Sequence, residues 1–141
     1  MIGTDAIIGF LAVMLMIFLM INSLNQEITK NTKTKELIYL KSKALFFADS
    51  LIKNSNEKEP EKGIAFYNKD KKRVEENVID LDLMEKIKKE DFPEALKEIR
   101  LEFSDEKIII GEKKGNCFEA KRFVLIEKTG EKGVIFVSAC D

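Results

Sequence analysis

The stretch DAIIGFLAVMLMIFLMI, Asp5–Ile21, is apolar after its first residue, whereas the chain that follows it is dense in charge. The nineteen residues from Ala6 to Leu24 carry no charge, and only Asn22 and Ser23 interrupt their apolar character. A helix of that length rises roughly 28 Å, which is close to the hydrocarbon thickness of a bilayer. No basic residue precedes the run, and INSLNQE at its end lacks the small-residue cleavage site of a secretory signal. We therefore expect a retained helix that spans a membrane, packs against copies of itself, or does both.

A second helical pattern follows the polar patch TKNTKTK and lies in ELIYLKSKALFFADSLIKN. Its apolar residues recur at three- and four-residue spacings, which is typical of one buried stripe on a helix. The stripe consists of Leu37, Leu40, Ala44, Phe47, Ala48 and Leu51. No Pro or Gly lies between Gly9 and Gly63, so a single helix can be apolar first and amphipathic afterwards. The patch Thr29–Thr34 has weak helix propensity, and we expect a bend or fraying there.

The remainder of the chain contains turn signals and short apolar runs that predict a sheet. NSNEKEPEKG, residues 54–63, is a polar loop that ends the long helix. The next elements are two short strands, in GIAFYN and at residues 74–78, a short helix in LDLMEKIKKE and another helical piece, PEALKE, beginning at Pro93. Four strands follow, beginning with the alternating Ile99, Leu101 and Phe103 and continuing with KIIIG, AKRFVLIEK and GVIFVSAC.

The predicted fold class is α+β, with a long N-terminal helix, apolar then amphipathic, packed on a small antiparallel meander. Residues 1–27 are expected to form a transmembrane or assembly helix, residues 28–54 its amphipathic continuation, and residues 55–141 a globular α+β domain. FVLI and VIFV are apolar on both faces, so both sides of the sheet should be covered. The helix stripe provides one cover, and the short helices or another copy of the chain provide the other.

Charge and composition exclude several function classes. The 24 Lys and Arg residues balance 25 Asp and Glu, so the mixed surface offers no electrostatic footprint for nucleic acid. The absence of His removes the usual general base and the commonest transition-metal ligand. The sequence contains no phosphate-binding Gly-rich loop, His-based triad or nucleophile elbow. We therefore predict a non-enzymatic protein without metal, cofactor, nucleic acid or small-molecule substrate.

Acidic residues are the remaining candidates for chemistry. Asp80 and Asp82 could form a carboxylate pair, but at a helix start they are better explained as cap and dipole residues. An enzyme that uses Asp80, Asp82 and Glu85 is the least favoured alternative. The loop EKEPEK could bind a divalent cation weakly, although a solvated loop explains it better.

Cys117 and Cys140 are the feature with the most distinctive chemistry. Two cysteines are too few for a structural zinc site. One interpretation is a disulfide that closes the last hairpin, places the domain outside the cytoplasm and contributes about 3 kcal/mol. The other interpretation is two unlinked, buried thiols. A hairpin that turns at TGEK puts Cys140 opposite Lys121, so the bond would need a bulge, or a bend of GNCF over the strand end.

The whole architecture resembles the archaeal type IV pilin-like proteins, in which an apolar helix continues as an amphipathic one and a small antiparallel sheet follows. ALFFADSLIKN and GIAFYNKDKKRV are also similar to secreted proteins of this kind from methanogens. Prepilins are cut after a Gly just before the apolar helix, and Gly3 in MIGTDAIIGF occupies that place. The resemblance implies processing between Gly3 and Thr4. Thr4 can then cap the helix, and Asp5 either complements the helix dipole or pairs with the terminal amine of a neighbouring subunit.

The resemblance implies a subunit that is first anchored in a membrane and then assembled into a surface filament with itself or with other pilin-like subunits. The expected assembly residues are Asp5, Phe10, Leu11, Leu15, Phe18 and Leu19. The alternative is a single-pass membrane accessory protein of a secretion or motility machine, whose domain binds a partner without polymerising. The cysteines favour an extracellular domain, whereas Lys30, Lys33 and Lys35 after the apolar run favour a cytoplasmic one.

Overall fold

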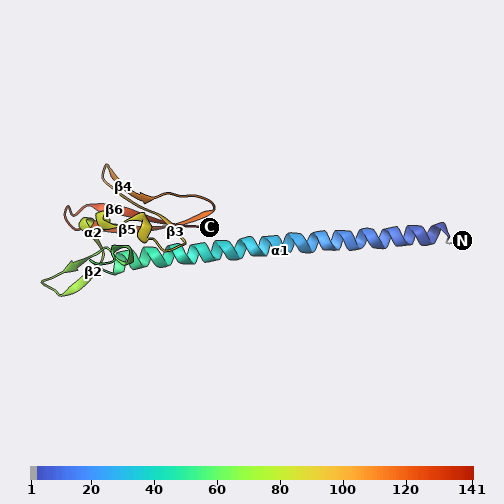
Figure 1. Ribbon diagram of the computed structural model, residues 1–141, viewed down its shortest axis with the longest axis horizontal. Helices are drawn as coiled ribbons and strands as arrows, with labels where there is room; N and C mark the ends of the chain where they lie inside the picture. Colours follow the sequence, from blue (N-terminus) through green and yellow to red (C-terminus); the bar gives the residue numbers. More distant parts are fainter. Residues whose placement is uncertain (1–2) are drawn as a thin grey trace. The chain divides into compact units, whose positions relative to one another are not determined.

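The computed structural model describes residues 3–141, with residues 4–6 described by their backbone alone. The chain divides into two units, the first ending at Leu37 and the second comprising Ile38–Asp141. Helix α1, Thr4–Lys53, supplies the regular structure of the first unit and the opening helix of the second (Figure 1). The sheet and the short helices all belong to the second unit.

Helix α1 runs without interruption through the polar patch Thr29–Thr34. The hydroxyls of Thr29, Thr32 and Thr34 each donate a hydrogen bond to the carbonyl oxygen four residues earlier, at 2.8 to 3.0 Å. These bonds give the hydroxyls partners inside the helix, so they do not draw the backbone into turns. The predicted fraying is therefore wrong, and the predicted single long helix is confirmed.

The second unit is built on a six-stranded sheet with the order β1-β2-β5-β6-β3-β4. The strands are β1 (Ala65–Asn68), β2 (Arg73–Ile79), β3 (Leu96–Phe103), β4 (Glu106–Gly111), β5 (Cys117–Ile126) and β6 (Lys132–Cys140). The short helices are η1 (Pro60–Lys62), α2 (Leu81–Lys86) and η2 (Lys89–Asp91). All neighbouring strands are antiparallel except β2 and β5, which are parallel. The α+β class and the helix on a sheet are confirmed, although the sheet is mixed.

The last four strands do not follow one another across the sheet, as the predicted meander requires. β3–β4 and β5–β6 are hairpins, and β6 pairs with β3. The segment 112–116 therefore crosses the ends of β3 and β6 to connect β4 with β5. β6 contains the apolar run VIFV, and its central place buries Ile135 and Val137 on the core face, whereas a meander would leave it at an edge. Val134 and Phe136 on the other face are only partly buried, and Phe123 of β5 is exposed, so the expectation that both sides of the sheet are covered is wrong within the described chain.

Pro93 does not begin a helix, in contrast to the prediction for PEALKE. The Leu96 N–H donates to the Pro93 carbonyl at 2.9 Å in a turn, and Leu96 is already the first residue of β3. The Leu96 side chain is buried in the core together with Ile99 and Leu101. Burial of this extended strand overrides the local helix propensity of the segment.

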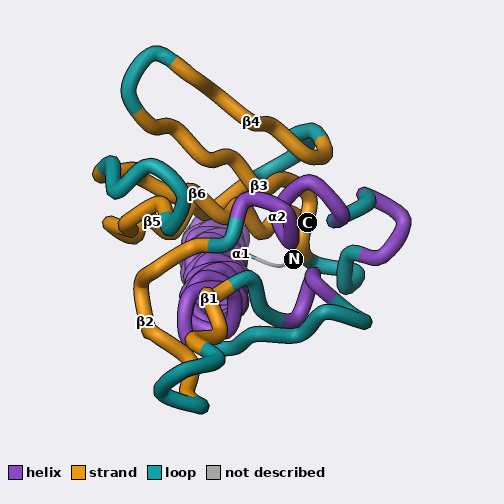
Figure 2. Tube along the Cα trace, turned by 90° about the vertical axis from the view of Figure 1, so that its left-hand side faces the viewer, coloured by secondary structure: helices purple, strands orange, loops and turns teal. Residues whose placement is uncertain are grey.

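The core of the second unit lies between the sheet and the part of α1 that follows Ile38. Figure 2 views α1 along its axis, with the strands curled around it. Of the predicted stripe, four residues are buried: Leu40, Ala44, Ala48 and Leu51. The prediction that Leu37 is buried is wrong, because this residue is 55% exposed. Phe47 is only partly buried. The packed stripe therefore begins about one turn later than predicted.

Candidate functional site

Helix α1 begins directly after Gly3, and its first part presents most of the predicted assembly residues. Five of them have side chains that are more than half exposed: Phe10, Leu11, Leu15, Phe18 and Leu19. The side chains of Thr4 and Asp5 lie outside the described residues. The cap at Thr4, the role of Asp5 and the processing after Gly3 therefore stay predictions.

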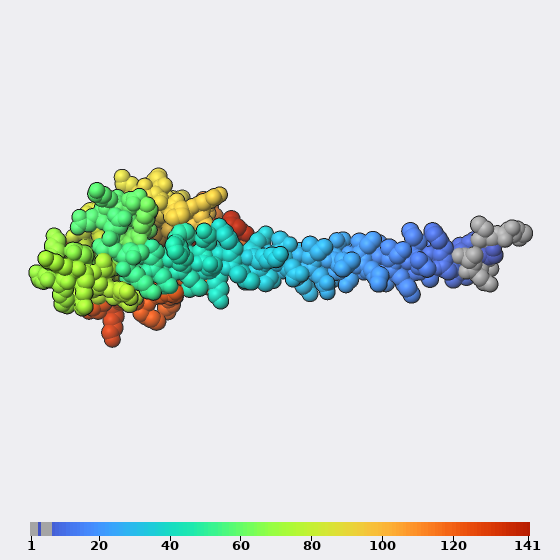
Figure 3. All heavy atoms as spheres, turned by 90° about the horizontal axis from the view of Figure 1, so that it is seen from below, coloured from blue at the N-terminus to red at the C-terminus, as the bar shows by residue number. Residues whose placement is uncertain are grey.

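The first part of α1 has no polar face between Ile7 and Ile21. Every residue in this range is apolar, and the rest of the chain buries none of them. Figure 3 shows the side chains of this stretch uncovered along the helix. Covering one large apolar side chain is worth about 1.5–3 kcal/mol, so a surface of this extent is strongly unfavourable in water. The helix is long and apolar enough to span a membrane.

The apolar surface gives way to a polar strip along one side of α1. The residues that line the strip are Asn22, Asn25, Gln26, Thr29, Lys30 and Lys33. Their spacing of three and four residues places them on one side of the helix. Amide and ammonium groups are costly in hydrocarbon, so the strip marks where a spanning helix would leave the bilayer.

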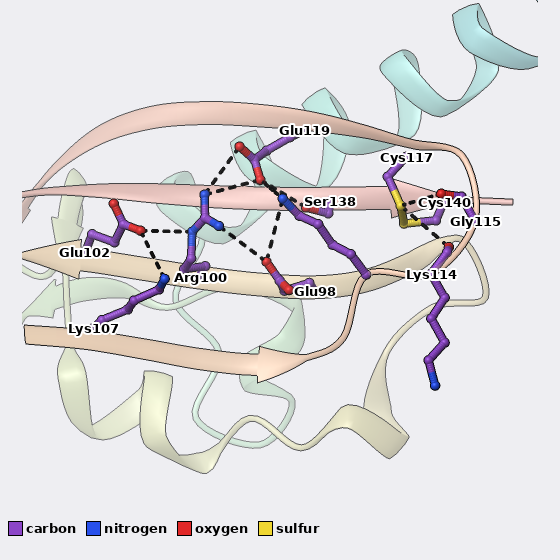
Figure 4. Close-up of polar contacts among 11 residues, drawn as sticks. Glu98, Arg100, Glu102, Lys107, Lys114, Gly115, Cys117, Glu119, Ser138 and Cys140 are labelled. Carbon is purple, nitrogen blue, oxygen red and sulfur yellow. Dashed lines mark hydrogen bonds and ion pairs between the residues drawn. A yellow bond between two sulfur atoms is a disulfide. The ribbon is translucent and has the colours of Figure 1, made fainter.

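Cys117 and Cys140 form a disulfide, as the first of the two interpretations predicted (Figure 4). The two residues lie directly opposite each other on β5 and β6, with their Cα atoms 4.1 Å apart. The predicted register was wrong, because Lys121 pairs with Phe136 and not with Cys140. The turn lies earlier than TGEK, and Gly130 closes it with a φ of +70°. The bond therefore needs neither a bulge nor a bend.

Beside the disulfide, two hydrogen bonds hold Asp141 against the crossover segment 112–116. The Asn116 N–H donates to the Asp141 carboxylate at 2.8 Å, and the Asp141 N–H donates to the Asn116 carbonyl at 3.2 Å. Gly115 has a φ of +81°, and a Cβ at this position would lie 2.6 Å from the Asp141 carbonyl oxygen. Only glycine fits that approach. The end of β6, the start of β5 and the crossover are thus held together.

The outer face of β3, opposite the core, centres on Arg100 (Figure 4). Its guanidinium lies 3.1 Å from Glu102, 3.4 Å from Glu119 and 3.9 Å from Glu98. The guanidinium carbon also lies 4.2 Å from the ring centre of Phe136, where a cation–π interaction forms. The Arg100 Nε faces Glu102 as an ion pair without a hydrogen bond to any described residue. Arg100 therefore links β3 to β5 and β6.

Two lysines extend this charged network. Lys113 contacts Glu119, and Lys107 lies 3.7 Å from Glu102. The fully buried Ser138 hydroxyl donates to Glu119 at 3.4 Å. Three carboxylates thus meet one guanidinium and two ammonium groups, so the charges balance across the outer face. These contacts link the neighbouring strands β4, β3, β6 and β5 across the outer face of the sheet.

Two of the acidic residues near α2, Asp80 and Asp82, have structural partners. The Asp80 carboxylate accepts from the Asp82 N–H at 2.9 Å, which confirms the predicted helix cap. Asp82 pairs with Lys128, and this hydrogen bond raises the pKa of the Lys128 ammonium. Glu85, the third carboxylate of the enzyme alternative, is an exposed residue of α2.

In the loop EKEPEK, Glu59 pairs with Lys62 at 2.6 Å, as expected for a solvated loop. Within the described residues, no group of three or more His, Cys, Asp or Glu side chains is arranged to hold a metal ion. Comparison of the chain with protein-family models, curated proteins and solved structures finds no match. A functional proposal therefore rests on the chain's own features, of which the apolar helix and the disulfide are the most specific.

Proposed function

We propose that this chain is a pilin-like subunit, anchored in a membrane by the first part of α1 and then assembled through it into a surface filament. The observation that carries the proposal is the apolar surface from Ile7 to Ile21, which the chain itself does not cover. Lipid covers such a surface in the anchored state, and the helices of other subunits cover it in the filament. In this proposal the second unit faces outward.

Helix packing in place of lipid is physically reasonable for this sequence. Lipid tails are as apolar as leucine, so helices associate in a bilayer through van der Waals packing and not through the hydrophobic effect. Large side chains at Phe10, Leu15 and Phe18 offer extensive packing surface once several helices come together.

The disulfide supports an outward-facing second unit. Disulfides persist in oxidising surroundings and are rare in the cytosol. Cys117 and Cys140 occupy opposite positions in a regular β-ladder, so the fold itself brings the two sulfurs together. Export of the second unit lets this bond form and endure.

A second candidate function is a single-pass membrane accessory protein whose second unit binds a partner without polymerising. The observation that favours it is the position of Lys30, Lys33 and Lys35 directly after the apolar run. Basic residues at the end of a span favour the cytoplasmic side, and a cytoplasmic domain would not be exposed on a filament.

Filament formation by the variant Phe10→Ala with Leu15→Ala separates the two candidates. Both changes keep the helix apolar but remove packing volume. We expect filaments to disappear from sheared surface fractions viewed by negative-stain microscopy, while the chain stays in the membrane with its second unit folded. A matched variant, Phe10→Leu with Leu15→Met, should retain filaments. Persistence of filaments in the alanine variant would contradict the proposal that this helix is the packing core.

A further inference from the structure

The sheet of the second unit has two unpaired edges. β4 is the last strand of the sheet, so its outer side has no neighbouring strand among the described residues (Figure 2). On the other side of the sheet, β2 pairs with β5 only at Leu125 and Ile126. The stretch Cys117–Val124 of β5 therefore also has no neighbouring strand on that side within the described chain. Unpaired edges are ready templates for strand addition.

The direction of the backbone N–H and C=O groups shows which residues could form hydrogen bonds with a strand added at each edge. The Ile126 N–H donates to Glu131 inside the β5–β6 hairpin, so alternate residues of β5 direct their backbone groups away from β6. These are Glu119, Lys121 and Phe123. In β4, the tight turn after Phe103 makes Glu106 a hydrogen-bonded partner of β3. Lys107 and Ile109 therefore direct their N–H and C=O groups outward.

Among the described residues, the two most exposed large apolar side chains of the sheet lie on these same edges. Ile109 on β4 is 51% exposed and Phe123 on β5 is 73% exposed, and both are residues with outward backbone groups. Both side chains lie on the face that also carries Arg100, opposite the core. A strand that joined either edge would find an exposed apolar side chain on the matching face.

We propose that copies of this chain join edge to edge, with β4 of one copy added antiparallel to β5 of the next. β5 and β3 run in one direction and β6 and β4 in the other, so two copies in the same orientation present antiparallel edges. The side-chain alternation of the two strands matches as well. In both strands, the residues with outward backbone groups have their side chains on the outer face. Such a contact is head-to-tail and can repeat without closing.

The neighbouring strand and the charges select one register. β2 occupies the place beside Leu125, which stops the added strand from sliding further toward it. A shift by two residues in the other direction would put Lys107 opposite Lys121, an unfavourable pair of like charges. A shift by four residues would place Ile110 and Gly111 beyond the start of β5 at Cys117 and so shorten the pairing. The register between these limits places Lys107 opposite Phe123 and Ile109 opposite Lys121, with Ile109 and Phe123 as diagonal neighbours.

The backbone at the β5 edge can still accept the added strand. The Lys121 carbonyl already accepts a hydrogen bond from the Arg122 guanidinium at 3.0 Å. A carbonyl oxygen has two lone pairs, so it can also accept from Ile109 of the added strand. The inference does not rest on the proposed filament, because every residue of the contact lies in the second unit.

Thiol crosslinking of the full chain in lipid vesicles tests this contact. One population has Ile109→Cys and the other Lys121→Cys, and a short bis-maleimide is added without reductant so that the native disulfide stays closed. We expect a covalent dimer in the mixture, several-fold more abundant than with either variant alone. Ile109→Cys mixed with Lys128→Cys is the matched control, since Lys128 is exposed and lies away from both edges.

Three outcomes would overturn the inference. One is a dimer of Ile109→Cys alone that equals the mixed product, which indicates β4 pairing with β4. Another is a mixed product no stronger than that of the control pair. The third outcome concerns the same cysteine variants in the Phe10→Ala, Leu15→Ala background. Filaments that persist in that background without any crosslink would contradict both proposals. A crosslink that survives the loss of filaments supports the edge contact and separates it from the helix packing.

Discussion

The two units of this chain differ in how much of their apolar side-chain surface is buried. In the second unit, apolar residues alternate with charged ones, and side chains such as Ile99 and Leu101 are fully buried within the chain. In the first unit, Ile7–Ile21 has no such alternation, and none of these residues is buried. The second unit therefore covers most of its own hydrophobic surface, whereas the first leaves its hydrophobic surface uncovered. Substitutions that affect only one unit test this division.

Replacing Leu101 with Ala should have the largest effect. Its side chain is fully buried, and loss of such a leucine typically lowers the free energy of unfolding by about 2–5 kcal/mol. Denaturant unfolding of the full chain in detergent, followed by circular dichroism, measures it. Ile109→Ala on the exposed edge is the control and should change stability by less than about 0.5 kcal/mol. Loss of Leu101→Ala from the membrane fraction would contradict the independence of the two units.

Replacing Leu15 with Lys should act on the first unit alone. A lysine at the centre of a spanning helix costs about 2.5–3.5 kcal/mol of insertion free energy. We expect less chain in the carbonate-washed membrane fraction, while Leu15→Met behaves as the unchanged chain. Equal membrane recovery of the lysine and methionine variants would mean that this stretch is not the spanning segment.

Removing the disulfide with Cys117→Ser and Cys140→Ser should destabilise the second unit by about 3 kcal/mol in the chain-entropy model. Denaturant midpoints of the variant and of the chemically reduced chain should agree, since both lack the same crosslink. A variant as stable as the oxidised chain would show that the hydrogen bonds between Asp141 and Asn116 suffice to hold the strand ends.

Replacing Asp49 with Asn should have the smallest effect. Its carboxylate accepts from the Arg122 guanidinium at 2.8 Å, and this pair links α1 to β5. Both side chains are partly exposed, so solvent screening limits the expected loss to about 1 kcal/mol or less. Asp70→Asn in the β1–β2 turn is the control. A loss as large as that of Leu101→Ala would show that the helix is held to the sheet by charge and not by its apolar stripe.

Much of the fold could be predicted from local patterns. Residue spacing predicts an element in three places: the apolar run, the stripe from Leu40 to Leu51 and the period-two strands. The pairing of β6 with β3 could not be predicted in this way, because it joins segments far apart in the chain. The helical expectation at Pro93 failed for a related reason, since burial of Leu96 in the sheet decides the conformation there.

The site was predictable in identity but not in geometry. Cys117 and Cys140 were paired correctly, yet their register depended on a turn that Gly130 closes earlier than TGEK suggests. The charged network on the outer face was missed, although Glu98, Arg100 and Glu102 alternate along one strand and so share one face. Its partners come from other strands, which spacing alone does not bring together.

In the proposed function, the first unit packs into a surface filament while the second lies outside the cell. The intact mass of the chain, recovered from sheared surface filaments of native cells without reductant and with free thiols blocked, tests it most directly. We expect a chain that begins at Thr4, carries no blocking label and is two hydrogens lighter than its reduced form. A chain found only in the membrane fraction, uncut and labelled at both Cys117 and Cys140, would contradict it.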